Sequence, residues 1–138
     1  MKVNVEKAIQ EIRDGLPGHS VRVQEDGDGG AFVIVDGIDP GQGFSPASTW
    51  IGFHITWPYP DADVYPHFVD PKLQYTGAGV APIQHPDGNL PTAMGRGAVM
   101  PGFNISAIQI SRKSNHRNAR TDSALQKLLR IIVFLQSR

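Results

Sequence analysis

The first apolar positions of the chain recur with a helical period. Val5, Ile9, Ile12 and Leu16 are separated by 4, 3 and 4 residues, which places them on one face of a helix. The "LPG" of 16–18 contains a proline and a glycine, two residues that end helices. The pattern therefore predicts an N-terminal amphipathic helix that ends near residue 15.

The next segments alternate or are continuously apolar, as strands are. The turn residues "EDGDGG" (25–30) predict a hairpin, and the loop "DGIDPGQGFSPAS" (36–48) separates the second strand from the third. The predicted strands are "HSVRVQ" (19–24), "AFVIV" (31–35), Trp50–Trp57 and the short "HFV" (67–69), which Asp70 and Pro71 end. We expect these three or four strands to form an antiparallel meander.

The second half of the chain begins with an irregular segment. Residues 72–103 are rich in glycine and proline and have no clear period, which is typical of a functional segment inside a compact domain. "NISAIQIS" (104–111) alternates and predicts a short strand or extended segment. A helical stripe follows, with Asp122 or Thr121 as the expected N-cap, and consists of Leu125, Leu128, Leu129, Ile132 and Leu135.

This order of elements predicts one α+β domain over residues 1–138. It consists of an N-terminal helix, a four-stranded antiparallel meander, an irregular segment and a C-terminal helix. An antiparallel sheet of this kind buries its apolar side by packing helices on one face or at one end.

A proline-rich corner follows the third predicted strand. The stretch "WPYPDADVYPHFVDP" (57–71) contains four prolines, and two of them form the pairs Tyr59-Pro60 and Tyr65-Pro66. Proline fixes φ and has no N–H to donate, so the corner can hold its shape without ladder hydrogen bonds. We expect the tyrosine rings to pack over the pyrrolidine rings.

Composition and charge narrow the classes of function. The chain has no cysteine, which excludes disulfides, zinc–thiolate sites and thiol catalysis. No apolar run approaches the roughly 18 residues that span a bilayer, and the charged N-terminus is unlike a signal peptide, so we expect a cytoplasmic protein without membrane contact.

The net charge of zero is unevenly distributed. Residues 1–110 hold 6 Lys/Arg and 12 Asp/Glu, whereas residues 111–138 hold 7 Lys/Arg and 1 Asp. The basic segment could face nucleic acid, an acidic partner or the acidic rest of its own domain. No basic–aromatic repeat of the kind that binds single strands is present, so nucleic acid is not expected as a partner.

The order of elements and the proline corner resemble the ubiquitin-conjugating enzyme fold. In that fold an N-terminal helix precedes a four-stranded meander, whose third strand runs into a Tyr-Pro motif and a short fourth strand. Two segments, "YPDADVYPHFVDPKL" and "SRKSNHRNARTDSALQKLLRIIVFL", look like the bacterial branch labelled prokaryotic family E. The resemblance implies a ubiquitin-like protein and a ThiF-type activating enzyme as partners. Members also travel with JAB-type peptidases, often in operons of antiviral defence.

The missing cysteine is the main departure from that family. The family carries its modifier as a thioester, and a chain without cysteine would need a hydroxyl in its place. "HPDGN" (85–89) partly matches the family's His-Pro-Asn motif, with His85 lying 26 residues before Ser111.

Placing "IQISRKSNHRNARTD" on the family pattern puts Ser111 nearest to the cysteine position, with Ser114 as the second candidate. A serine needs a base, which His116 could supply while Asp122 orients it. The basic residues around them could stabilise an oxyanion or bind the modifier's tail; they are Arg112, Lys113, Arg117 and Arg120.

Simpler interpretations stand beside each of these. Ser111 could be an ordinary turn serine, His116 a solvated histidine, Asp122 the helix cap and the arginines a charged face. An engineered replacement of cysteine by serine or alanine would also explain the composition.

His54, His67 and His85 could cluster with Asp61, Asp63 or Asp87, but none has the spacing typical of zinc ligands, and no metal is expected. "GAGV" and "GRG" lack the context of a phosphate loop, so no nucleotide or other cofactor is expected.

Two hypotheses of function follow. In the first, the chain carries a ubiquitin-like protein in a bacterial conjugation pathway through an oxygen ester on Ser111 or Ser114. In the second, it is a catalytically inactive module that binds the modifier or its activating enzyme. A third reading is an unrelated α+β domain that binds a small ligand under the irregular segment, which the absence of a four-stranded meander would favour.

Overall fold

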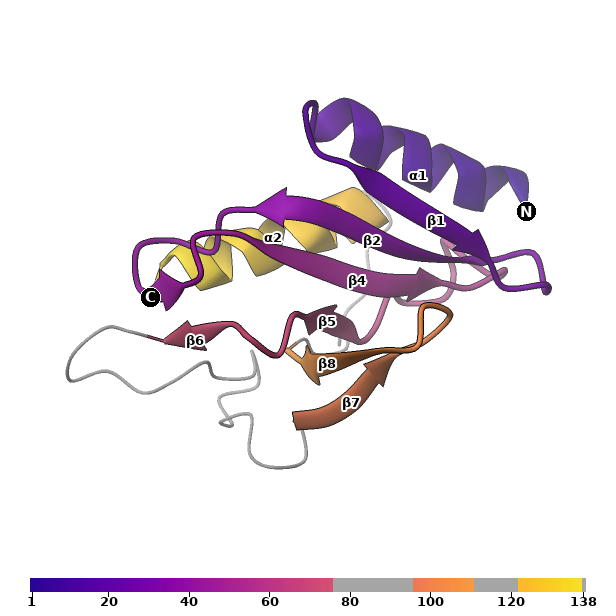
Figure 1. Cartoon of the computed structure of the whole chain (residues 1–138). Coiled ribbons are helices and arrows are strands. Elements are labelled where there is room, and N and C mark those ends of the chain that lie inside the picture. The colour runs from indigo at the N-terminus through magenta and orange to yellow at the C-terminus, as the bar shows by residue number, and fades with distance from the viewer. Residues whose placement is uncertain (76–95, 111–121, 138) are drawn as a thin grey trace.

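A computed structural model describes residues 1–75, 96–110 and 122–137 (Figure 1). Two helices and eight strands make up this part of the chain. They are α1 Val3–Gly15, β1 Val21–Glu25, β2 Ala31–Ile38, β3 Phe44–Ser45, β4 Thr49–Ile55, β5 His67–Val69, β6 Gln74–Tyr75, β7 Arg96–Met100, β8 Ile105–Gln109 and α2 Ala124–Gln136. The predicted class, α+β, is confirmed.

The main sheet contains the predicted meander. Its strand order is β1-β2-β4-β5-β8-β7, and every neighbouring pair is antiparallel. β1 and β2 form the hairpin expected from the "EDGDGG" turn, with Val23 opposite Val33. The first four strands of the sheet therefore follow one another in chain order, as the sequence predicts.

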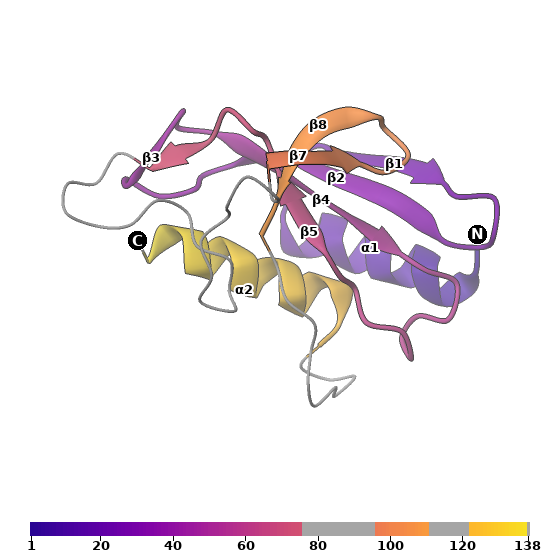
Figure 2. The same ribbon diagram turned by 90° about the horizontal axis from the view of Figure 1, so that it is seen from below.

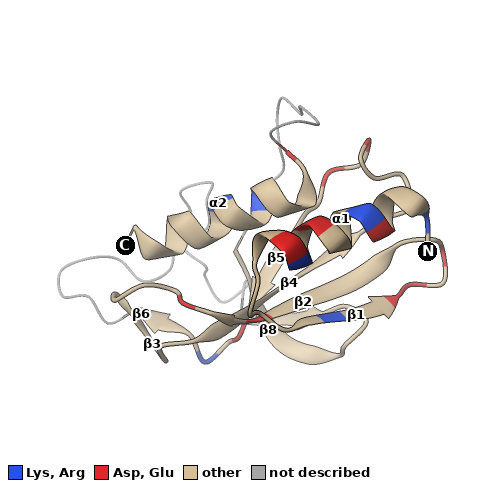
Figure 3. Cartoon of the chain, turned by 90° about the horizontal axis from the view of Figure 1, so that it is seen from above, with Lys and Arg blue, Asp and Glu red and all other residues tan. Residues whose placement is uncertain are grey.

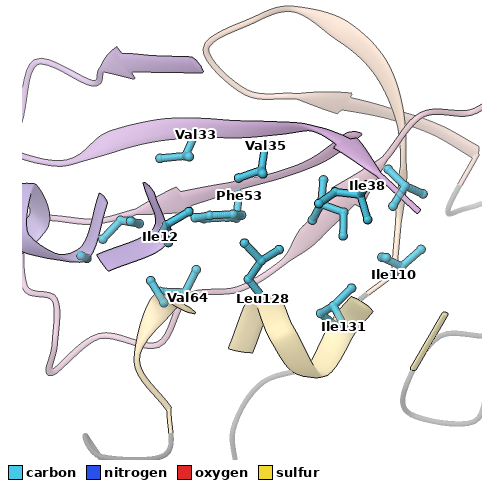
Figure 4. Packing of buried hydrophobic residues seen from close by; sticks show 14 of the residues in the cluster. Ile12, Val33, Val35, Ile38, Phe53, Val64, Ile110, Leu128 and Ile131 are labelled. Carbon is cyan, nitrogen blue, oxygen red and sulfur yellow. The ribbon is translucent and has the colours of Figure 1, made fainter. Parts of the chain in front are cut away.

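Both helices cover one face of this sheet (Figure 2). The core forms where their apolar stripes meet the inward positions of β2 and β4. Phe53 of β4 is fully buried there and lies among Ile12 of α1, Leu128 of α2 and Val35 of β2 (Figure 4). Burying side chains of this size stabilises the fold by about 1.5–3 kcal/mol each.

The β7–β8 hairpin curls over the opposite face of the sheet and forms a second apolar cluster with Ile34 and Phe68. Two glycines allow its close approach. A Cβ added at Gly52 of β4 would lie 2.7 Å from the sulfur of Met100, and one at Gly102 would lie 2.3 Å from a ring atom of Phe32.

Six strands thus replace the four-stranded sheet that the sequence predicts, because β8 and β7 add to the edge of β5. β7, together with the two-residue β6, lies in the segment that was expected to be irregular.

The start of α2 also differs from the prediction. Its N-cap is Ser123, whose hydroxyl accepts a hydrogen bond from the backbone N–H of Gln126 at 3.2 Å. The expectation that Asp122 or Thr121 caps the helix was wrong. The carboxylate of Asp122 instead binds the guanidinium of Arg130, a residue further along α2.

Candidate functional site

The described residues frame the segment to which the sequence assigns its catalytic candidates. Asp122 and the corner residues Tyr59, Pro60, Tyr65 and Pro66 are described. The remaining candidates lie outside the described residues: His85, Ser111, Arg112, Lys113, Ser114, His116, Arg117 and Arg120. The frame consists of the proline corner, the end of β8 and the start of α2.

The two corner tyrosines connect the corner to the start of α2 and to the end of β8. The hydroxyl of Tyr59 accepts a hydrogen bond of 3.1 Å from the backbone N–H of Ala124, the first residue of α2. The hydroxyl of Tyr65 accepts one of 3.2 Å from the side-chain amide of Gln109, the last residue of β8. The peptide bonds that join these tyrosines to Pro60 and Pro66 are both cis.

His67, in the strand that follows the corner, binds the residue just after β8 through its backbone. Its carbonyl oxygen accepts a hydrogen bond of 3.0 Å from the backbone N–H of Ile110. Its imidazole is fully buried, with the ring centroid 5.3 Å from that of Phe53. Burial lowers the pKa of His67 to about 3, and the nearby charge of Lys127 acts in the same direction, so the ring is neutral near pH 7.

Two ion pairs complete the frame. The ammonium of Lys127 binds the carboxylate of Asp63 in the corner, although the Lys127 side chain is only 7% exposed. Asp122, which is almost fully buried, pairs with the more exposed Arg130. The Lys127–Asp63 pair holds α2 to the corner, because removing one partner of a buried pair leaves an uncompensated charge. The Asp122–Arg130 pair links α2 to the residue that precedes its own N-cap.

The ion pairs also account for the basic charge of α2. Lys127 and Arg130 are the Lys/Arg residues of α2, and they lie between its start and its middle (Figure 3). Lys127 is neutralised by Asp63, which belongs to the acidic part of the chain, and Arg130 by Asp122. For Lys127, the interpretation that the basic segment faces the acidic rest of its own domain is confirmed, whereas Arg130 pairs with an aspartate of the basic segment itself.

Of the histidines considered as metal ligands, His54 and His67 lie on opposite faces of the sheet, and His85 lies outside the described residues. The ring of His54 stacks on Phe32, on the sheet face covered by the β7–β8 hairpin, whereas His67 packs against Phe53 on the helix face. Among the described residues, no three His, Asp or Glu side chains gather as metal ligands.

A second candidate site lies at the N-terminal end of the corner, next to the start of α1. The start of α1 and the beginning of the corner enclose an open cleft of about 490 Å³. Trp57, which is 56% exposed, lies in its wall, with the ammonium of Lys2 6.0 Å from the centroid of its ring. The lining consists of Lys2, Val3, Asn4, Trp57, Pro58, Tyr59, Pro60 and Asp61.

Exposed apolar side chains gather at this cleft. Val3 and Trp57 line it, and Met1 directly precedes it in the chain; their exposed fractions are 63%, 56% and 39%. Exposed apolar groups that lie together mark interaction surfaces more often than scattered ones do. The sequence predicts Trp57 only as the end of the third strand and the first residue of the proline corner, and assigns it no role in binding. The available signal was a tryptophan placed where an apolar strand runs into prolines.

No family model, curated protein or solved structure matches the chain. In the part of the chain that the structure describes, neither helix is long and apolar enough to cross a membrane. The two candidate sites are therefore assigned from their geometry alone.

Proposed function

We propose that the chain is a non-catalytic module of ubiquitin-conjugating architecture that docks the ThiF-type activating enzyme of a ubiquitin-like protein pathway. The observation that carries the proposal is the cleft at Trp57, which combines an exposed tryptophan with a cation. The helix, the four-stranded meander and the Tyr-Pro corner that precede α2 are in keeping with that architecture.

The chemistry of the cleft favours a particular kind of partner segment. Trp57 offers a large apolar surface, and tryptophan is among the residues that contribute most binding energy at interfaces. Lys2 places a positive charge beside the ring, while Asp61 lies further along the lining. A segment with a large apolar side chain followed by a carboxylate would complement Trp57 and Lys2, and we expect the activating enzyme to present one.

Two observations favour a non-catalytic role. The chain has no cysteine for a thioester. One carboxylate oxygen of Asp122, the residue expected to orient His116, is bound by Arg130. A base oriented by that carboxylate would have to share it with a guanidinium.

Binding measurements with the activating enzyme from the same genome test the proposal. Calorimetry should give a Kd that rises about thirtyfold or more for Trp57→Ala, since a central aromatic hot spot is worth about 2 kcal/mol or more. Val133→Ala is the matched control, because Val133 is a similarly exposed apolar residue on α2. Equal affinities of the two variants, or no binding by the unmodified chain, would refute docking at this cleft.

A serine carrier is the second candidate function. It is favoured by the double attachment of the frame, in which His67 and Tyr65 hold the end of β8 while Tyr59 holds the start of α2. A fixed frame suits a segment that must present a reactive group in one position. Ser111 or Ser114 would then carry the modifier as an oxygen ester.

Intact mass spectrometry separates the two candidates. The chain is incubated with ATP, the ubiquitin-like protein and the activating enzyme. A carrier gains the mass of the modifier minus one water, loses it in hydroxylamine and gains nothing as Ser111→Ala or Ser114→Ala. The docking module forms a complex without a covalent adduct.

A further inference from the structure

The mostly buried carboxylate of Asp26 links the β1–β2 turn to His54 of β4. Oδ2 of Asp26 lies 2.7 Å from Nε2 of His54, and the Asp26 side chain is only 7% exposed. The imidazole is 29% exposed and stacks on Phe32 of β2 with the ring centroids 4.2 Å apart. A histidine held in this way keeps one orientation while it remains open to protons from water.

Asp26 also shapes the turn in which it lies. Its Oδ1 accepts hydrogen bonds from the backbone N–H groups of Asp28 at 2.7 Å and Gly30 at 3.0 Å. The packing at Gly30 is tight, because an added Cβ would lie 2.5 Å from Oδ2 of Asp26 and 2.4 Å from the carbonyl oxygen of Ile55. The conformation of the turn therefore depends on the position of this one carboxylate.

The same turn supports the cleft. The carbonyl oxygen of Gly29 accepts a hydrogen bond of 2.8 Å from the backbone N–H of Lys2, the residue that precedes α1. Gly29 also touches Trp57, since a Cβ added there would lie 3.3 Å from Cβ of the tryptophan. Both walls of the cleft thus contact a turn that Asp26 and His54 hold in place.

We propose that the Asp26–His54 pair is a pH-responsive latch that sets the position of Lys2 and Trp57 and thereby the shape of the cleft. With a neutral imidazole the link is a single hydrogen bond. With a protonated imidazole it becomes an ion pair with a mostly buried carboxylate, which is the stronger contact. The latch is a property of the isolated chain, and only its effect on partner docking rests on the proposed function.

The charges around His54 favour this response. Asp26 faces the imidazole of His54 from the turn, and Phe32, which stacks on it from β2, carries no charge. On the neighbouring strand β5, His67 packs on the other face of the sheet and does not face His54. Two other charged groups near the turn have partners elsewhere: Glu25 binds the amino group of Met1, and Lys2 lies over Trp57. Asp28 adds a further negative charge within the turn. Desolvation raises the pKa of Asp26, but the hydrogen bonds from His54 and from the backbone of Asp28 and Gly30 outweigh it and lower the pKa below its ordinary value. The Asp26 carboxylate is therefore charged near neutral pH.

Tryptophan fluorescence tests the latch without any partner. The Trp50→Phe variant leaves Trp57 as the sole tryptophan, and we expect its emission to change with pH as His54 gains a proton. His54→Gln, whose amide can still donate to Asp26, should give a flat profile. His19→Gln, which alters a histidine bonded to the carbonyl of Asp36, should keep the transition.

A charge variant adds an independent readout. Asp26→Asn can still accept hydrogen bonds but removes the anion, so protonation of His54 can no longer form an ion pair and the pH response of the Trp57 emission should be strongly reduced. An undiminished response in Asp26→Asn, a response that persists in His54→Gln, or a flat profile in Trp50→Phe alone would overturn the latch. Failure of the activating enzyme to bind would overturn the proposed function and leave these results unaffected.

Discussion

The buried His67 makes a quantitative prediction about stability at mildly acid pH. Burial lowers its pKa from 6.5 to about 3 in the folded chain, so native His67 stays neutral at pH 5. The unfolded chain regains the ordinary value and binds a proton there. Because the unfolded state binds more protons at His67 than the native state between pH 6.5 and 3, the contribution of His67 to stability is greatest above pH 6.5 and falls as the pH is lowered through this range.

The magnitude follows from the two pKa values. At pH 5 the unfolded side chain lies 1.5 pH units below its pKa of 6.5, and each unit corresponds to 1.36 kcal/mol. The native side chain at pH 5 is still well above its pKa of about 3 and contributes no offsetting proton. We expect His67 to lower the free energy of unfolding by about 2 kcal/mol between pH 8 and pH 5.

Urea unfolding at the two pH values measures this difference. His67→Gln removes the titrating group at similar volume, so its loss of stability between pH 8 and pH 5 should be about 2 kcal/mol smaller than that of the unmodified chain. The variant's overall stability is not the readout, since any packing cost applies at both pH values. His19→Gln is the control, because a histidine outside the core should leave the pH dependence in place.

Two outcomes would refute this reasoning. One is a loss of less than about 0.5 kcal/mol by the unmodified chain between pH 8 and pH 5, which would mean that native His67 takes up a proton as readily as the unfolded chain. The other is an equal loss in His67→Gln, which would assign the pH dependence to other groups.

Two further predictions concern the fold. Ser123→Ala removes the side chain that caps α2 and should lower the free energy of unfolding by about 1 kcal/mol in urea titrations, whereas an unchanged midpoint would mean that another group caps the helix. Gly102→Ala forces a side chain onto a backbone with φ of +82° and toward the ring of Phe32, and should cost about 1–3 kcal/mol. Hydrogen exchange in β7 and β8 should rise in the Gly102 variant, and unchanged exchange would contradict the role given to this glycine.

Local patterns were sufficient for most of the elements. The helical spacing of Ile9 and Ile12 marks α1, and the alternation of Val21 and Val23 marks β1, because one buried face imposes its period on the sequence. β7 has no such mark. Its residues join the sheet because Met100 packs over Gly52, a contact between positions far apart in the chain.

The cap of α2 shows a related limit. Three consecutive residues at its start, Thr121, Asp122 and Ser123, are all of types that cap helices. The pattern cannot choose among them, because the choice depends on Arg130, which binds the carboxylate of Asp122, while Ser123 takes the cap position.

The candidate site was predictable only in part. The proline corner and its tyrosines are visible in the sequence, since paired Tyr-Pro motifs interrupt an apolar strand. The partners of the corner are not visible. Asp63 and Lys127 are 64 positions apart, and a lysine on an amphipathic helix is ordinarily solvated. Burial of Lys127 depends on where the corner places Asp63, which only the folded chain determines.

Tyr59 connects the two candidate functions. Its side chain lines the Trp57 cleft, and its hydroxyl binds the first amide of α2, so a single buried residue touches both the proposed docking surface and the start of α2. A partner that shifts Tyr59 on docking must also alter the hydrogen bond at Ala124, because the aromatic ring is rigid. If the chain docks a partner at this cleft, docking is therefore coupled to the start of α2, which follows the serine-containing segment in the chain. A module that binds its partner at this cleft would also act on the segment from which a carrier activity could arise.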